Sequence, residues 1–279
     1  MVAAPESPFR SDLFAEQVVF VTGGATGIGK EICRSFGQHG ARIAIASRKQ
    51  EALDAAAEEL RAEGIDVWVH ACDVRDAAAV RATVEGIVEY FGRLDVVVNN
   101  AAGNFPALIS NISPNGFKTV VDIDLLGTYN VSKAAFEVWL RDHGGNIVNI
   151  TAPFEQRGAA LQAHVAAAKA GIDSLTRTCA VEWGRHGVRV NAVGPGAIGN
   201  TEGVKRFSEA VPGSTPDDDG SEAPRANNPV GLLGHGADIA HMVMYFCSPG
   251  ARIVSGQVIQ VDGAGSVDAM KLDLSRFEQ

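Results

Sequence analysis

The chain has 279 residues, of which 46% are hydrophobic, and it carries a formal net charge of −9. This length is enough for one large hydrophobic core or for two small domains. The acidic balance argues against a nucleic-acid-binding protein and against binding to an anionic membrane surface, because both polyanions would repel the chain. The basic residues are spread along the sequence, which still allows a local cationic pocket for a phosphorylated ligand.

The four cysteines lie far apart and form no Cys-x-x-Cys pair, which predicts free thiols in a reducing compartment and no metal site. The first residues lack the apolar core of a secretory signal. No run reaches the roughly 18 apolar residues of a membrane span, and the last residues match no peroxisomal address. These features predict a cytoplasmic protein without a membrane partner.

Short apolar runs alternate with helical patterns along the whole chain. Most of these runs are too continuous for burial on one face only, which indicates a parallel sheet covered on both sides. The alternation predicts a single α/β domain over residues 1–279 with a Rossmann-like, doubly wound parallel sheet and an N-terminal tail at residues 1–13. The expected strands are Val18–Thr22, Ala41–Ala46, Asp66–His70, Leu94–Asn99, Asn146–Thr151, Val188–Val193 and Gln257–Val261. The expected helices are Gly27–His39, Gln50–Glu63, Ala77–Phe91, Pro114–Asp142, Ala160–Arg185 and Ala237–Ser248.

A glycine-rich turn follows the first expected strand, with the sequence Gly23-Gly-Ala-Thr-Gly27-Ile-Gly29. Glycines at such a turn let the backbone approach a pyrophosphate at the positive end of the following helix. The spacing is Gly-x-x-x-Gly-x-Gly, not the commoner Gly-x-Gly-x-x-Gly. Between a buried strand and an amphipathic helix it predicts a dinucleotide site. The cofactor-binding residues expected here are Gly23, Ala25, Thr26, Gly27 and Ile28.

The end of the second strand indicates which dinucleotide is bound. An acidic residue there would bond the adenosine 2′-hydroxyl of NAD. This chain has Ser47, Arg48 and Lys49 instead. Two cations and a hydroxyl can bind a phosphate, and no carboxylate is present to repel it. The prediction is therefore NADP(H).

Two further segments fit a dinucleotide groove at the carboxyl ends of the strands. Asp73 and Val74 follow the third strand, where a carboxylate can bond the adenine amino group. Asn99 ends the fourth strand and is followed by small residues, including Ala101, that let a cofactor pass closely.

Taken together, these residues resemble the short-chain dehydrogenase/reductase family over essentially the whole chain, with Lys169 and Pro195-Gly196 as further matches. Members of that family usually carry a Ser, a Tyr and a Lys, with an Asn on the preceding helix. Here Lys169 is kept, but Val165 stands at the tyrosine position and Ala152 at the serine position. Asp124 stands at the asparagine position.

The altered residues restrict the chemistry. Reduction of a ketone needs a proton donor at the oxygen beside the carbon that receives hydride, and Val165 cannot be that donor. Reduction of a conjugated C=C bond makes a different demand, because charge spreads to a thioester oxygen as an enolate and carbon is protonated afterwards. Hydrogen-bond donors near that oxygen then matter most, and water can deliver the proton.

One branch of the family has this altered site, the 2,4-dienoyl-CoA reductases, and especially those of peroxisomal type. The chain resembles that branch in specific stretches, among them Ala101-Ala-Gly-Asn-Phe105, Arg141-Asp-His-Gly-Gly145 and Val181-Glu-Trp-Gly184. The resemblance implies an NADPH-dependent reduction of 2,4-dienoyl-CoA to 3-enoyl-CoA in the β-oxidation of unsaturated fatty acids, with an acyl-CoA thioester as substrate. It also implies a homo-oligomer, either a dimer or a tetramer.

The resemblance assigns residues to the site as well. Lys169 and Asp124 would be catalytic, and the cofactor would also touch Lys169, Pro195, Gly196 and Ile198. The substrate would meet Arg48, Arg75, Asn104, Phe105 and Arg206.

Residues 199–230 would form a substrate loop that leads into a stretch rich in Pro, Gly, Ser and acidic residues, Glu209–Asn228. This stretch is either a solvated insertion or a lid over the substrate, since lids are weakly packed segments beside a site.

The expected roles follow from charge. Lys169 would bond the nicotinamide ribose hydroxyls, while its charge favours the developing enolate. For Asp124 the sequence leaves three roles open: pairing with Lys169, positioning a water, or donating a proton itself. His164 is a tempting substitute acid, but neighbouring helix positions lie about 100° apart, so we expect it to face away from Val165.

Two other functions stay open. One is a reductase of another enoyl or 3-oxoacyl thioester or of a carbonyl substrate. The other is a non-catalytic NADP(H)-binding protein that has lost its Ser and Tyr.

Overall fold

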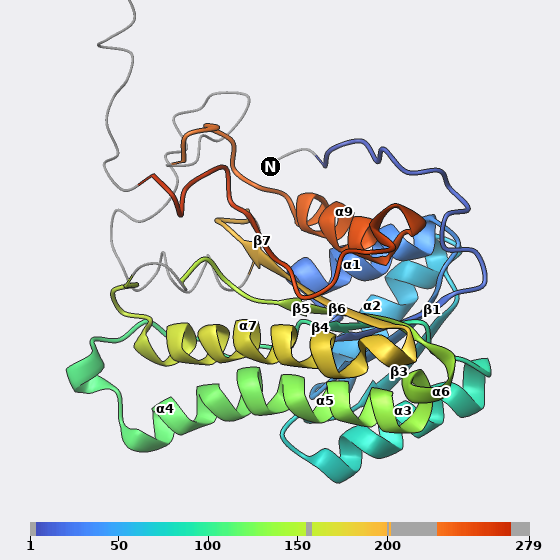
Figure 1. The fold of residues 1–279 in the computed structure, drawn as a ribbon, viewed down its shortest axis with the longest axis horizontal. Helices are drawn as coiled ribbons and strands as arrows, with labels where there is room; N and C mark the ends of the chain where they lie inside the picture. The colour runs from blue at the N-terminus through green and yellow to red at the C-terminus, as the bar shows by residue number, and fades with distance from the viewer. Residues whose placement is uncertain (1–3, 155–157, 200, 202–227, 269–279) are drawn as a thin grey trace, which may run out of the picture.

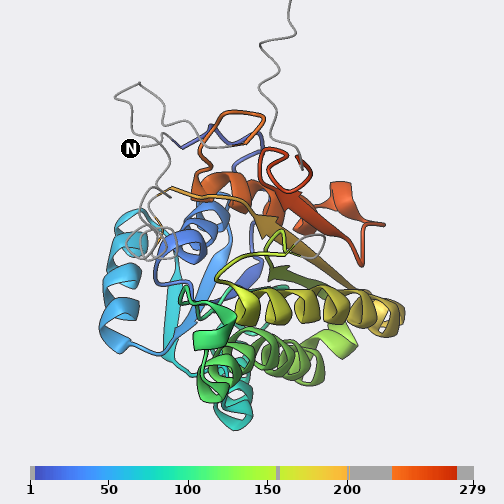
Figure 2. The ribbon, with the colours of Figure 1, turned by 90° about the vertical axis from the view of Figure 1, so that its left-hand side faces the viewer.

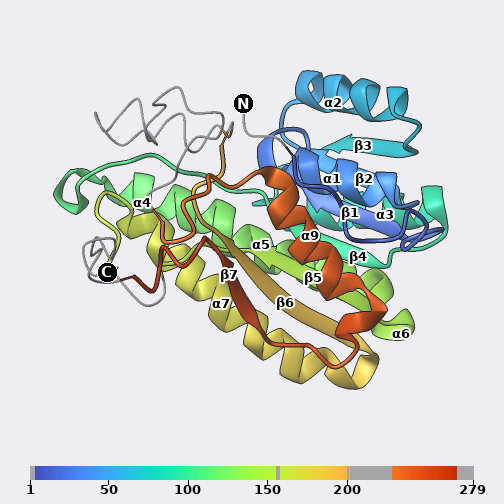
Figure 3. The same cartoon turned by 90° about the horizontal axis from the view of Figure 1, so that it is seen from above.

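The computed structural model describes residues 4–154, 158–199, 201 and 228–268. In this part of the chain, drawn in colour in Figure 1, seven strands form one parallel sheet in the order β3-β2-β1-β4-β5-β6-β7, which can be followed in Figure 3. The order reverses direction between β1 and β4, which is the switch point where doubly wound sheets bind ligands. The strands are β1 Val18–Thr22, β2 Arg42–Ser47, β3 Val67–Ala71, β4 Val96–Asn99, β5 Gly145–Ile150, β6 Val188–Pro195 and β7 Val258–Val261.

Helices cover both faces of the sheet. On one face lie α1 (Gly27–Gln38), α2 (Gln50–Ala62) and α9 (Gly236–Cys247), and on the other α3 (Ala77–Phe91), α5 (Gly127–Ala135) and α7 (Ala163–Trp183), as Figures 2 and 3 show. The three layers confirm the predicted Rossmann-like fold.

The position of β1 in the sheet explains why its sequence is apolar without interruption. Val19 and Val21 pack into the core beneath α1, α2 and α9, while Val18 and Phe20 pack into the core on the opposite face. Because successive side chains of a strand point to opposite faces, a strand covered twice must be apolar at every position. Only a sheet between two helical layers meets that condition here.

The long helix expected over Pro114–Asp142 is one continuous helical run with two wider turns. It consists of α4 (Pro114–Val121), a π-helical turn η2 (Asp122–Leu126), α5, a second π-helical turn η3 (Phe136–Leu140) and α6 (Arg141–His143). A π turn inserts an extra residue into a helix and is frequently found at functional sites. The first of the two contains Asp124.

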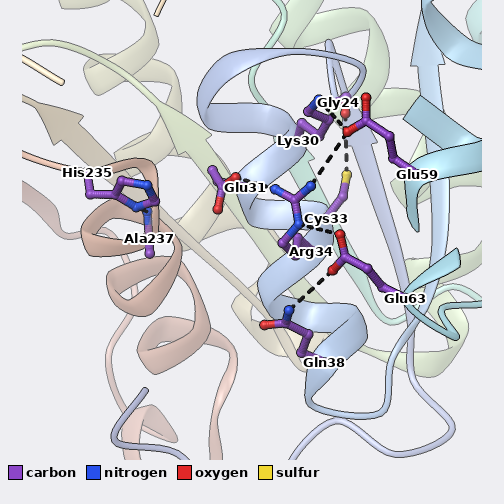
Figure 4. Close-up of polar contacts among 10 residues, drawn as sticks. All are labelled: Gly24, Lys30, Glu31, Cys33, Arg34, Gln38, Glu59, Glu63, His235 and Ala237. Atoms are coloured by element: carbon purple, nitrogen blue, oxygen red, sulfur yellow. Dashed lines mark hydrogen bonds and ion pairs between the residues drawn. The ribbon is translucent and has the colours of Figure 1, made fainter. Parts of the chain in front are cut away.

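Ion pairs join α1 to α2 on the surface, as Figure 4 shows. Arg34 pairs with Glu31 on its own helix and, through Nε, with Glu63 beyond the end of α2 at 2.8 Å, while Lys30 pairs with Glu59 at 2.8 Å. Helix α1 follows the glycine-rich turn, and α2 follows the loop that carries Arg48. The pairs therefore help to fix that loop relative to the glycine-rich turn.

Part of the predicted N-terminal tail contacts the rest of the domain. The hydroxyl of Ser7 lies 2.8 Å from Nε2 of His39, and Phe9 and Leu13 pack against the core. Of the predicted substrate loop, residues 202–227 lie outside the described residues. No helix in the described ranges has the length and apolar character needed to cross a membrane.

Candidate active site

A cavity of about 410 Å³ lies at the carboxyl ends of the strands, around the switch point between β1 and β4. It extends from the glycine-rich turn, past the ends of β2 and β3, to the loop after β4. Ten of the predicted site residues line it: Gly23, Thr26, Gly27, Ile28, Ser47, Arg48, Asp73, Val74, Ala101 and Asn104.

The glycine-rich turn leaves no room for a side chain at Gly29. A Cβ atom added to Gly29 would lie 2.4 Å from Nδ2 of Asn100 and 2.5 Å from the carbonyl oxygen of Gly23. That amide donates to the carbonyl oxygens of Thr22 and Gly23, at 3.0 and 3.2 Å. The turn is therefore held against the end of β4, with its backbone bare toward the cavity, as a pyrophosphate-binding turn requires.

The carboxylate of Asp73, which follows β3, is paired with the guanidinium of Arg75. Nε and Nη2 of Arg75 donate to Asp73, and this hydrogen bond is the largest cause that holds the pKa of the Asp73 carboxyl below its ordinary value. Arg75, expected to meet the substrate, is thus engaged by a residue expected to meet the cofactor. Its guanidinium is still substantially exposed, so a second anion can approach it.

Lys169 and Asp124 form the centre of the site. The ammonium of Lys169, on α7, donates to the carbonyl oxygen of Ile150 at the end of β5, at 2.9 Å. The same ammonium lies 3.3 Å from Oδ2 of Asp124, an ion pair that is not aligned as a hydrogen bond. Lys169 is 6% exposed and Asp124 is 0% exposed. In such a poorly hydrated place a charge interacts strongly with its surroundings.

The other oxygen of Asp124 holds the loop after β4. The backbone N–H of Gly103 donates to Oδ1 of Asp124 at 2.7 Å, and the hydroxyl of Thr128 donates to its carbonyl oxygen at 2.6 Å. The π turn thus brings Asp124 between the loop that lines the cavity and the ammonium of Lys169. Of the three roles left open by the sequence, the geometry contains the pairing with Lys169.

The two positions at which the family usually carries a tyrosine and a serine hydroxyl have no hydroxyl here. Val165 lies one turn before Lys169 in α7 and is buried, and Ala152 follows the end of β5. Among the described residues, the side chains beside Lys169 at these two positions have no proton to give. The site keeps a cation and a carboxylate but has no phenol.

His164 does not line the cavity, and it is not on the surface either. Its imidazole is 0% exposed and packs against the ring of Phe105, with ring centroids 4.3 Å apart. On its other side Phe105 meets the first turn of α4, where Gly116 leaves only enough room for the ring. Phe105 is therefore held between α4 and α7, with 39% of it exposed.

Comparison with known proteins agrees with this geometry. A family model described as Enoyl-(Acyl carrier protein) reductase matches residues 23–265. The (3E)-enoyl-CoA-producing peroxisomal 2,4-dienoyl-CoA reductase of Rattus norvegicus is 44% identical over 270 residues, which are 96% of this chain and 90% of that protein. The chain belongs to the short-chain dehydrogenase/reductase family.

Two further relatives extend the comparison. A probable (2E)-enoyl-CoA-producing 2,4-dienoyl-CoA reductase of Bacillus subtilis is 36% identical over 251 residues, which are 89% of this chain and 96% of that protein. The crystal structure of an actinorhodin polyketide ketoreductase with NADPH superposes with a TM-score of 0.81 at 30% identity, covering 90% of this chain and 97% of that one. As a member of this family, the chain uses a nicotinamide dinucleotide, and the bare glycine turn and the cavity beside it fit one.

Two residues that were expected at the cofactor, Asn99 and Ala25, do not line the cavity. Nδ2 of Asn99 donates to Ser132 and to Asn149, at 2.9 and 2.8 Å, so this amide joins β4, α5 and β5 beneath the cavity. These buried partners take both protons of the amide. Ala25 is likewise packed in the core.

The remaining predicted residues lie around the cavity or outside the described ranges. Pro195 ends β6 and is followed by Gly196, and Ile198 is buried beside Gly234, so all three are at the same end of the sheet as the cavity without lining it. Lys49 is exposed at the start of α2. Arg206 falls in the part of the chain that the structure does not describe.

The cavity also has lining residues that the sequence did not single out. Asn100, Ala102 and Gly103 belong to the small-residue segment already noticed after β4, so its pattern could have included them. Ile123 comes from the π turn, and no local sequence signal identifies it, whereas Thr201 lies in the predicted substrate loop at residues 199–230.

Proposed function

We propose that this chain is an NADPH-dependent 2,4-dienoyl-CoA reductase that forms 3-enoyl-CoA. The observation that carries the proposal is the buried Lys169–Asp124 pair in a site whose tyrosine and serine positions hold Val165 and Ala152. Such a site lacks the acid that carbonyl reduction needs, but keeps a cation where negative charge develops. The names of the relatives in Rattus norvegicus and Bacillus subtilis support the same substrate class.

The overall reaction adds a hydride and a proton across a conjugated system. Bound NADPH supplies the hydride, which reaches the δ carbon of the dienoyl group. Negative charge then spreads to the thioester oxygen as a dienolate, and a proton added at the α carbon leaves a β,γ double bond. The protein must therefore stabilise a transient oxyanion and direct a proton to carbon.

Lys169 carries out the first task. Its ammonium is held in place by the hydrogen bond that it donates to the carbonyl oxygen of Ile150 and by the ion pair with Asp124. A fixed positive charge with little water around it stabilises a developing oxyanion without first having to reorient. The same ammonium would hold the nicotinamide ribose hydroxyls and so orient the hydride donor.

Asp124 supports the second task. Its Oδ1 is occupied by Gly103, whereas Oδ2 has no aligned hydrogen-bond donor among the described residues. That oxygen can accept from a water and orient its other proton toward the substrate. Water is thus the proton donor that the geometry favours in a site without a phenol.

The preference for NADPH rests on the end of β2. Ser47 and Arg48 line the cavity and Lys49 follows them, so that a phosphate on the adenosine ribose would meet two cations and a hydroxyl. Arg48 and Arg75 would also face the phosphates of coenzyme A, together with Arg206. Asn104 and the half-exposed Phe105 would meet the thioester and the acyl chain.

Enzyme assays distinguish this proposal from the others. Purified protein is mixed with NADPH or NADH and with dienoyl-CoA substrates of short and medium chain length, and oxidation of the nicotinamide is followed at its absorbance band. Turnover with NADPH and a dienoyl-CoA supports the proposal. Turnover only with a 3-oxoacyl thioester would select the alternative reductase, and tight NADPH binding without turnover of any substrate would select a non-catalytic binding protein.

Three other expectations remain predictions. Cytoplasmic location, assembly into a dimer or tetramer, and a substrate loop at residues 199–230 are each open to direct measurement. Fractionation, the molar mass in solution and protection of the loop from proteolysis by acyl-CoA would test them in turn.

A further inference from the structure

Buried polar atoms without a hydrogen-bond partner gather beside the proposed site. Among the described residues they include Oδ1 of Asn104, Oε1 of Gln162 and both ring nitrogens of His164. Folded proteins pair almost all such atoms with protein groups or with ordered water. An apolar side chain at position 164 would fill the same space without this cost. The cluster therefore calls for a bound polar ligand.

These residues come from two segments that lie side by side. The backbone N–H of Ala107 donates to the carbonyl oxygen of Leu161 at 3.0 Å, which joins the loop after β4 to the segment before α7. The rings of Phe105 and His164 are in contact across the same junction. At its other end the loop is bonded to Asp124 through Gly103. Asn104, His164 and Asp124 are thus held around one loop.

The His164 imidazole is suited to hold a neutral ligand. Burial is the main cause that lowers its pKa below the ordinary value. The backbone of Phe105, which approaches the ring without the geometry of a hydrogen bond, and the charge of Asp124 oppose that shift. An uncharged imidazole has one nitrogen that donates and one that accepts. Water is the small molecule that can accept from a ring N–H and at the same time donate to oxygens such as Oδ1 of Asn104.

We propose that His164 is a positioning residue, which together with Asn104 holds a buried water behind Phe105, next to Asp124. This inference rests on the proposed function and deepens it. By holding this water, His164 and Asn104 set the position of the loop from Gly103 to Phe105. Through that loop it sets the position of Asp124 and of the water that delivers the proton. His164 itself does not touch the reacting atoms.

The kinetic test compares two replacements of one side chain. His164→Phe keeps a flat ring of similar size but removes both nitrogens, whereas His164→Gln keeps a donor and an acceptor. We expect His164→Phe to lower kcat about tenfold or more, with little change in KM for NADPH, and His164→Gln to recover most of the loss. His241→Phe, which replaces a partly buried histidine on the distant helix α9, is the control and should leave kcat unchanged.

Each outcome has a defined meaning. Equal kcat for His164→Phe and wild type would overturn the inference, and so would an equal loss in the phenylalanine and glutamine variants, because only packing would then matter. NADPH binding and the melting temperature of each variant show that it is folded. If His164→Phe does not fold, His164→Met takes its place, with the same expectation for kcat.

A second measurement does not depend on turnover. A high-resolution crystal structure of the protein with NADP(H) should show an ordered water within hydrogen-bonding distance of a ring nitrogen of His164 and of Oδ1 of Asn104. A dry cluster, or ring nitrogens bonded directly to protein groups, would overturn the inference even if the enzyme reduces dienoyl-CoA. Conversely, failure of every dienoyl-CoA substrate would refute the proposed function and leave this structural test intact.

Discussion

At the scale of single residues, the site depends on what surrounds one lysine. A lysine on an exposed helix face would need no special role. Lys169, however, is buried in α7 between the end of β5 and the carboxylate of Asp124. The sequence predicted both residues from a family pattern. It could not predict that Asp124 also binds Gly103, because that contact depends on a π turn, which no local sequence pattern specifies.

Replacement of Lys169 should affect activity and stability together. Lys169→Ala removes the cation near the oxyanion and leaves a buried carboxylate unpaired, so we expect kcat/KM to fall about 10²–10³-fold. The free energy of unfolding should fall by about 3 kcal/mol. Steady-state kinetics and urea denaturation measure the two effects.

The double variant separates these two effects. Lys169→Ala combined with Asp124→Ala removes both charges, so the unpaired carboxylate no longer contributes and the double variant should be more stable than Lys169→Ala alone. Its activity should remain as low. A stability loss equal to the sum of the two single losses would contradict the ion pair seen in the structure.

At the scale of secondary-structure elements, the sequence predicted strands and helices well because each is buried in a regular way. The expected strand ends differ from the observed ones by at most two residues, as in β2, expected at Ala41–Ala46 and found at Arg42–Ser47. The two π turns in the run from α4 to α6 could not be predicted, because the hydrophobic pattern of an α-helix changes little when one turn is widened. The direction of a side chain was harder to predict than the element that carries it. Asn99 ends β4 as expected, but its amide is bonded to Ser132 and Asn149.

The turn between β1 and α1 gives a test at this scale. Gly29→Ala places a methyl group 2.4 Å from Nδ2 of Asn100, so the amide must give up its bonds to Thr22 and Gly23. We expect NADPH affinity to fall at least about tenfold, because the turn and the loop after β4 separate. Fluorescence titration with NADPH measures the affinity.

Gly184→Ala is the matched control for the glycine variant. Gly184 follows α7, its φ is −54°, and an added Cβ would meet nothing within 4 Å. NADPH affinity and stability should both stay close to those of the wild type. Equal affinities of the Gly29→Ala and Gly184→Ala variants for NADPH would show that the turn does not need its glycine.

At the scale of the whole molecule, two helical layers enclose the sheet and bury the four cysteines. All four are free thiols, as the sequence predicted. Burial raises the pKa of Cys179 to about 11 and that of Cys247 to about 12, and raises the pKa of Cys33 still further. The overall architecture was predictable because the alternation of elements permits few topologies. The residues that complete the cavity from distant segments, such as Ile123, were not.

The buried thiols predict an alkaline limit of stability. A group whose pKa is raised on folding contributes stability that is complete below its unfolded pKa, which is 9.0 for these thiols, and that is lost as the pH rises toward the folded value. The free energy of unfolding should therefore fall between pH 9.0 and about 12. Urea denaturation across this range measures the loss.

Thiol labelling checks the same burial. At pH 8 a thiol reagent should modify Cys33, Cys179 and Cys247 of the folded protein slowly and should reach them fully only in denaturant. Rapid labelling of Cys33 or Cys247 in the folded protein would contradict the packing of α1 and α9 against the sheet.

The most direct test of the proposed function combines NADPH oxidation with analysis of the product formed in deuterated water. The proposed site predicts one NADPH consumed for each dienoyl-CoA, with a β,γ double bond in the product and deuterium at the α carbon. Product with an α,β double bond and deuterium at the γ carbon would contradict the proposed direction of protonation. Absence of NADPH oxidation with dienoyl-CoA of every chain length would contradict the proposed activity itself.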